Sequence, residues 1–123
     1  TDESKEQTYK TQNYLGKSVT SIQKELTDKG LKVITLGTGN KIINQYPIKN
    51  ITLTKNNLVV LLTNDYDKTM VDLSGLSYKE CKEVLDLMNI EYELSGYGYV
   101  TEQSIPPGTK VSEKLKVTLS KLY

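Results

Sequence analysis

The chain has 123 residues, a length that suits one domain of ordinary size or two very small ones. Sixteen lysines and fifteen carboxylates give a net charge of +1, so the basic excess that attracts nucleic acid is missing and we expect no nucleic-acid partner. One cysteine and no histidine exclude an internal disulfide and a Cys/His zinc site, and we expect neither a metal nor a cofactor.

The sequence repeats itself after 59 residues. The offset then shortens to 58 and finally to 57, as expected where turns gain or lose a residue. Such a run indicates a structural repeat. The aligned pairs include Gly16 with Gly75, Ser18 with Ser77, Leu26 with Leu85, Gln45 with Gln103, Val60 with Val117 and Leu62 with Leu119.

The repeat divides the chain into four parts. Residues 1–13 are expected to be a polar linker from a preceding domain, and residues 14–63 the first copy. Residues 64–69 form a short charged linker, and residues 70–123 the second copy.

A helix is predicted near the start of each copy. Ser18 and Ser77 are predicted N-caps, and Ser77 with Glu80 has the spacing of a capping box. Apolar residues then recur at helical spacing. Both helices are predicted to end at a residue type that tolerates the left-handed conformation, Gly30 in one copy and Asn89 in the other.

Three extended segments follow each helix. The first alternates apolar and polar residues from Leu31 or Ile90, and a Gly-x-Gly turn leads to the second. The third is the apolar segment Leu58 to Leu62, or Leu115 to Leu119. We therefore predict an α+β protein of two tandem modules, each with one α-helix packed on a three-stranded antiparallel β-sheet.

The second copy also carries a family pattern. It opens with Asp-Leu-Ser-Gly at residues 72–75, continues through Ser77 and Glu80, and closes with Val-Thr-Glu-Gln-Ser-Ile-Pro-Pro-Gly-Thr at residues 100–109. This pattern resembles the PASTA domain, and the resemblance covers about residues 14–120. It departs where the usual opening Pro is missing in both copies and where Asn50 replaces a loop Gly.

The resemblance implies a non-catalytic module on the extracytoplasmic face of the membrane of a Gram-positive bacterium, anchored through a segment absent from this chain. It implies that the module positions or regulates a peptidoglycan transpeptidase, a penicillin-binding protein of cell division, by weak binding to peptidoglycan or a partner. The alternative is the muropeptide- or β-lactam-sensing ectodomain of a transmembrane Ser/Thr kinase. Implied partners are peptidoglycan or muropeptides, β-lactams, division proteins and a preceding transpeptidase domain.

The candidate binding residues are Tyr97, Tyr99, Gln103 and Lys110. Tyrosine offers a flat apolar face with a hydroxyl, which suits a sugar ring or a partner protein. Alternate tyrosines can instead pin a turn or pack between the two modules, so both interpretations stay open.

No catalytic residue is predicted. Histidine is absent, and Cys81 falls on the apolar stripe of a helix, where free Cys usually behaves as a small core residue. Asp65, Asp67 and Asp72 lack the Gly-centred loop and closing Glu of a calcium site, so we interpret them as solvated linker residues.

Overall fold

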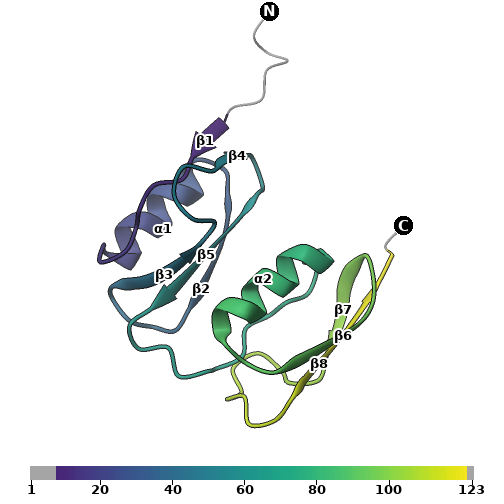
Figure 1. Ribbon diagram of the computed structural model, residues 1–123. Coiled ribbons are helices and arrows are strands. Elements are labelled where there is room, and N and C mark those ends of the chain that lie inside the picture. Colours follow the sequence, from purple (N-terminus) through teal and green to yellow (C-terminus); the bar gives the residue numbers. More distant parts are fainter. Residues whose placement is uncertain (1–7, 122–123) are drawn as a thin grey trace, which may run out of the picture. The chain divides into compact units, whose positions relative to one another are not determined.

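The computed structural model describes residues 8–121, so residues 1–7 of the predicted N-terminal linker lie outside the described residues. The chain forms two compact units, one ending at Asp65 and the other beginning at Tyr66. We call their described parts module 1 (residues 8–65) and module 2 (residues 66–121). Each holds one helix and one three-stranded sheet, as predicted (Figure 1).

The elements of module 1 are β1 (Thr8–Lys10), α1 (Val19–Asp28), β2 (Lys32–Leu36), β3 (Ile42–Tyr46), β4 (Thr52–Thr54) and β5 (Leu58–Thr63). Those of module 2 are α2 (Tyr78–Met88), β6 (Tyr92–Gly96), β7 (Tyr99–Gln103) and β8 (Leu115–Ser120).

The predicted starts of both helices and the predicted end of α2 are confirmed, with stronger capping in module 2. α1 ends one residue earlier than predicted, because its C-cap is Lys29 in the right-handed helical conformation and the left-handed Gly30 follows it. The Ser77 hydroxyl accepts a hydrogen bond from the Glu80 backbone N–H at 3.2 Å, and the Glu80 carboxylate accepts one from the Ser77 N–H at 3.0 Å. Asn89 ends α2 in the left-handed conformation, with φ 58°. In module 1 the N-cap bond to Ser18 is longer, 3.5 Å.

Both sheets are mixed, so the prediction of all-antiparallel sheets is wrong. In module 1 the last strand, β5, lies in the middle, parallel to β2 and antiparallel to β3. In module 2, β8 lies likewise between β6 and β7. A parallel pair needs a long crossover connection, and β3 or β7 with its following loop provides that length. Alternation shows which face of a strand is buried but does not identify its neighbours.

The strand pairing also corrects the alignment of the two copies. Val33 pairs with Val59 in module 1, and the corresponding Tyr92 pairs with Leu115 in module 2. The last strands therefore align with an offset of 56, so Leu61, not Val60, corresponds to Val117. β5 is apolar at five successive positions and offers no alternation to fix the register, whereas a slip of one residue exchanges the two faces.

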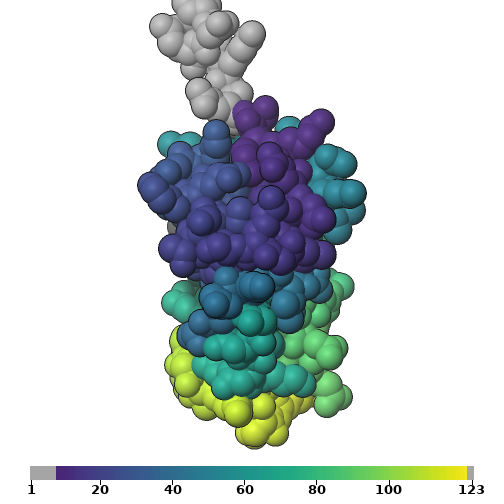
Figure 2. Space-filling view, turned by 90° about the vertical axis from the view of Figure 1, so that its left-hand side faces the viewer, coloured from purple at the N-terminus to yellow at the C-terminus, as the bar shows by residue number. Residues whose placement is uncertain are grey.

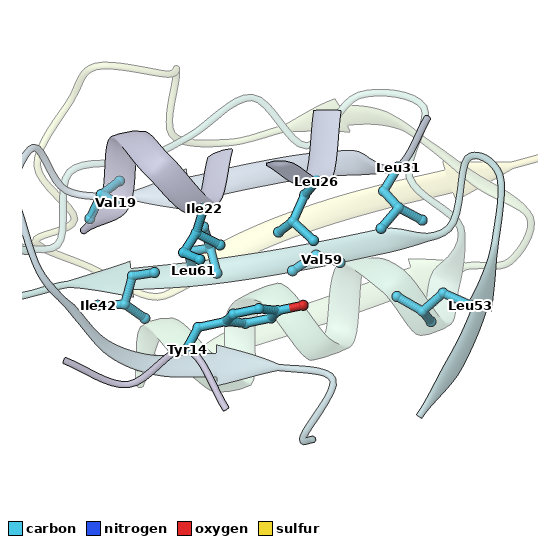
Figure 3. Packing of buried hydrophobic residues seen from close by; sticks show 9 residues of the cluster. All are labelled: Tyr14, Val19, Ile22, Leu26, Leu31, Ile42, Leu53, Val59 and Leu61. Atoms are coloured by element: carbon cyan, nitrogen blue, oxygen red, sulfur yellow. The ribbon is translucent and has the colours of Figure 1, made fainter. Parts of the chain in front are cut away.

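The core of module 1 lies between α1, β5 and the opening segment, residues 11–17. Ile22 and Leu26 of α1 point towards Val59 and Leu61 of β5, and the ring of Tyr14 lies beside them (Figure 3). All five side chains are at most 6% exposed. Burial of this apolar area, at about 25 cal/mol per Å², is the main force that holds the helix on the sheet.

Residues 8–13, which sequence reasoning assigned to the linker, form part of module 1. β1 pairs antiparallel with β4. The Tyr9 hydroxyl donates to the Glu25 carboxylate of α1 at 2.6 Å and lies 2.7 Å from the Tyr14 hydroxyl. Burial and these contacts raise the pKa of Tyr9, so the phenol stays protonated as the donor. In module 2 the corresponding strand pairing is shorter, an isolated bridge between Thr69 and Lys110.

Candidate functional site

The turn between β6 and β7 presents Tyr97 and Tyr99 to solvent. Their side chains are 68% and 45% exposed. Between them Gly98 has φ 108°, and a Cβ atom there would lie 2.6 Å from the Ser120 carbonyl oxygen. Only glycine allows the turn to lie this close to β8. The sequence-predicted tyrosines therefore lie on a turn whose backbone path is fixed by sterics.

Two residues that sequence reasoning missed lie at the same turn. The Tyr78 backbone N–H donates to the Gly98 carbonyl at 3.1 Å, and the Tyr78 side chain is 44% exposed. The Lys121 ammonium lies 6.0 Å from the centre of the Tyr97 ring, a cation–π distance. We call Tyr78, Tyr97, Tyr99 and Lys121 the tyrosine surface. It combines apolar ring faces, hydroxyls and one cation.

Module 1 uses the corresponding turn differently. The pairs Ile42–Thr63 and Val100–Leu119 are equivalent, which places Asp65 where module 2 has Lys121. The Thr38 backbone N–H and hydroxyl donate to the Asp65 carboxylate at 2.7 and 2.6 Å. These bonds, the hydroxyl bond first, lower the pKa of Asp65. The module 1 turn is thus fastened by a side chain, whereas the module 2 turn carries an exposed aromatic ring.

Gln103 lies at the far end of β7 and uses its amide inside the module. Its Oε1 accepts from the Leu73 N–H at 2.9 Å, and its Nε2 donates to the carbonyls of Val71 and Ile105 at 3.0 and 2.8 Å. All the polar atoms of this side chain are therefore engaged with backbone groups.

Gln45 makes the same set of bonds in module 1. Its Oε1 accepts from the Tyr14 N–H at 2.8 Å, and its Nε2 donates to the carbonyls of Gln12 and Pro47 at 2.9 and 3.0 Å. Gln45 is 8% exposed. We call Gln45 and Gln103 the glutamine braces. Each ties the segment that precedes the helix of its module, residues 11–17 or 70–76, to the end of a strand. Their recurrence in both copies was the signal of a structural role.

Lys110 lies near this brace and apart from the tyrosines. Its ammonium is 3.8 Å from the Asp67 carboxylate, with both side chains well exposed. The pKa of Asp67 is lowered, chiefly by a hydrogen bond from the Thr69 hydroxyl and also by the charge of Lys110. Partial loss of solvent acts in the opposite direction but does not outweigh them. β7 separates Tyr99 from Gln103 by about 13 Å at the usual rise per residue. The four predicted residues thus form two separate groups, and the structure does not bring them together.

The buried thiol and the carboxylates give no sign of reaction chemistry. Cys81 is fully buried on α2, and burial raises the pKa of its thiol to about 11. A thiol of this pKa is inert at neutral pH. Within residues 8–121, no group of three or more Cys, Asp and Glu side chains could hold a metal ion. Neither helix of this part of the chain is long and apolar enough to cross a membrane.

Comparison with known proteins gives a family and a fold. The family model described as "PASTA domain" matches residues 9–65 and 68–121. No curated protein matches the chain. The crystal structure of penicillin binding protein 2X from Streptococcus thermophilus matches with a TM-score of 0.83 and 24% identity, over 94% of this chain and 17% of that chain. The chain thus spans only a small part of that protein.

Two structures from Staphylococcus aureus also match. The three-PASTA-domain of a Ser/Thr kinase gives a TM-score of 0.35 at 20% identity, over 90% of this chain and 67% of that chain. The entire extracellular region of the Ser/Thr kinase PrkC gives a TM-score of 0.38 at 18% identity, over 89% of this chain and 46% of that chain. The two family matches coincide with the two modules, each with its helix, mixed sheet and glutamine brace. The chain therefore belongs to the PASTA-domain family and carries two such domains in tandem.

Proposed function

We propose that the two domains form a non-catalytic, extracytoplasmic module that positions or regulates a peptidoglycan transpeptidase of cell division. The module would act by weak binding to peptidoglycan or to a partner protein. Membership of the PASTA family supports this proposal, as does the similarity in fold to part of a penicillin binding protein.

The tyrosine surface is the observation that carries the binding part of the proposal. Its three tyrosines are between 44% and 68% exposed, and each flanks Gly98 in sequence or is hydrogen-bonded to it through the backbone. Lys121 lies 6.0 Å from the centre of the Tyr97 ring. Aromatic faces stack on the apolar faces of sugar rings, and a lysine attracts carboxylates as a mobile point charge. A surface of this kind suits shallow contact with a long anionic glycan. Gln103 and Lys110 stay candidates only as a second contact, because their polar groups already have partners.

The test is binding of the whole chain to purified peptidoglycan sacculi at low and at physiological salt. Replacing Tyr97 and Tyr99 together by Ala is expected to reduce retention about tenfold, since each stacked ring contributes about 0.5–1.5 kcal/mol. Thr101→Ala, an exposed non-aromatic position on β7, is the matched control and should leave retention unchanged. Equal retention of the double variant would contradict the proposal.

Titration with a defined muropeptide separates positioning from the kinase alternative. Positioning predicts weak binding that declines with salt, because the contact is shallow and partly ionic. Tight, stoichiometric and salt-insensitive binding would instead favour a sensing ectodomain. Normal division in cells whose transpeptidase lacks both domains would also contradict the positioning role.

A further inference from the structure

Module 1 exposes four large aliphatic side chains: Leu15, Ile43, Ile48 and Ile51, which are 48%, 54%, 69% and 41% exposed. They are the exposed aliphatic side chains of this size among the described residues of the whole chain. Several exposed aliphatic side chains on one small domain mark an interaction surface more often than a single exposed residue does.

Backbone pairing places the four residues in two pairs along the edge formed by the opening segment, one pair at each end of that segment. The Gly16 N–H donates to the Ile42 carbonyl at 2.7 Å, so Leu15 lies beside Ile43. At the other end of the opening segment, the Thr11 N–H donates to the Ile51 carbonyl at 2.9 Å, and the Thr11 hydroxyl donates to the Ile48 carbonyl at 2.6 Å. The N-terminal part of module 1, which includes the opening segment and is purple in Figure 2, forms part of the face shown there. We call the four side chains the aliphatic edge.

The same edge is polar or small in module 2. The hydrogen bonds equivalent to those of module 1 run from Gly75 to Val100 and from Met70 to Thr109. They align the four aliphatic residues with Ser74, Thr101, Pro106 and Thr109, all of which are exposed. The fold therefore does not require aliphatic residues here, so folding alone does not explain the aliphatic edge of module 1.

The chain segments that carry the aliphatic edge have only positively charged side chains of their own, and the nearby Glu25 of α1 is engaged by the Tyr9 hydroxyl. The segments 8–17 and 41–55 contain five lysines and no Asp or Glu. Lys17, Lys41 and Lys49 are exposed and make no ion pair with any residue among 8–121. The equivalent segments of module 2 contain Asp67, Asp72, Glu102 and Glu113 beside their lysines. Like charge opposes the approach of a second copy of this edge and favours an acidic partner.

We propose that the aliphatic edge and its lysines bind a protein surface that presents apolar side chains bordered by carboxylates. The apolar contacts supply the affinity, and the lysines select the acidic partner and speed its approach. This inference goes beyond the proposed function, because it assigns protein binding to module 1 and holds whether or not the tyrosine surface of module 2 binds glycan.

The experiment uses the whole chain as bait against two displayed peptide libraries. Both have the same apolar positions, but one has Asp and Glu at the remaining positions and the other has Lys. The acidic library is expected to give binders and the basic library none. Binding of an enriched acidic peptide should fall about tenfold when Leu15→Ser, Ile43→Thr and Ile51→Thr are combined, since these changes remove the apolar contacts at the centre of the interface. It should also weaken with salt and with Lys41→Glu.

The matched control variant combines Ser74→Ala, Thr101→Ala and Thr109→Ala at the equivalent edge of module 2, and its binding should be unchanged. The thermal midpoint of both variants should equal that of the wild type, because every substituted side chain is exposed. Equal enrichment from the basic library would overturn the proposal, as would binding unaffected by the module 1 substitutions. Concentration-dependent self-association that those substitutions abolish would assign the edge to a second copy instead.

Discussion

Modules 1 and 2 close the same turn with different chemistry. In module 1, Thr38 is bonded to the carboxylate of Asp65. In module 2 the turn presents Tyr97, with Lys121 over its ring, to solvent. The aliphatic edge shows the reverse pattern, apolar in module 1 and polar in module 2. The fold therefore allows the turn and the edge to vary in sequence. Module 1 carries the aliphatic edge, and module 2 carries the exposed aromatic turn.

The glutamine braces are common to both modules, and their substitution should cause the largest loss of folding stability. Replacing Gln45 by Met, which keeps the size, should cost about 3 kcal/mol because three backbone groups lose their partner in a buried place. Gln103→Met should cost less, about 2 kcal/mol, because water reaches that half-buried site. Amide hydrogen exchange resolved for β5 and β8 measures each module by itself. Gln12→Met, on an exposed side chain, is the control, and equal losses at both braces would contradict the ranking.

The Tyr9 contact exists only in module 1, and its removal should cause the second largest loss of stability. Tyr9→Phe removes a hydroxyl bonded to Glu25 and Tyr14 and should destabilise module 1 by about 1.5 kcal/mol. Tyr92→Phe removes the exposed bond to Asp86 in module 2 and should change stability by less than about 0.5 kcal/mol. Module-resolved exchange again gives both values. A loss for Tyr9→Phe no larger than for Tyr92→Phe would mean that β1 is not fastened to α1 by this contact.

The helix caps allow a finer comparison. Ser77→Ala should destabilise module 2 by about 1 kcal/mol, because both bonds of the capping box are lost. Ser18→Ala should cost about 0.5 kcal/mol, since its bond is long and no acidic residue completes a box. Circular dichroism melts of single and double variants would measure the two losses. The order would be wrong if Ser18→Ala proved the more damaging change.

The smallest expected effect is a pH dependence confined to the turn of module 1. The pKa of Asp65 is lower in the folded state, so its contribution to stability is complete above about pH 4 and disappears as pH falls further. Exchange of the Thr38 amide, which donates to Asp65, should therefore accelerate in acid relative to its intrinsic rate. Asp65→Asn should remove this acid dependence, whereas its persistence in the variant would exclude Asp65 as the cause.

The sequence was sufficient to predict the helices, because capping residues and apolar spacing are local signals. Ser77 and Glu80 mark the start of α2 and Asn89 its end, each within one helical turn of the end that it marks. The direction of the strand pairing was predicted wrongly, because it depends on contacts between segments distant in sequence. The alternation around Leu94 shows which face is buried but not that β8, rather than β7, lies next to β6.

The candidate site was predicted only in part, for a similar reason. Tyr97 and Tyr99 stand beside a Gly in sequence, so their exposure on a turn could be expected. Lys121 joins them only through the register of β8 against β7, which the sequence pattern did not provide. Gln103 was assigned to binding although the same amide recurs as Gln45, and in a repeat a shared polar residue more often holds the fold. Residues that differ between copies, such as Tyr97 and Lys121, instead mark the surface that we propose to bind.

The central position of the last strand has a consequence for how such a module folds during synthesis. β2 can complete no sheet with β3, because its partner β5 is the last segment of the module to be made. Until Leu58–Thr63 has left the ribosome, the helix has no complete sheet to cover, and its apolar stripe stays exposed. Each domain therefore stays incompletely folded, and exposes apolar surface to any chaperone that binds the nascent chain, until its last strand is made. Folding is completed when this strand inserts between the two outer strands of the sheet.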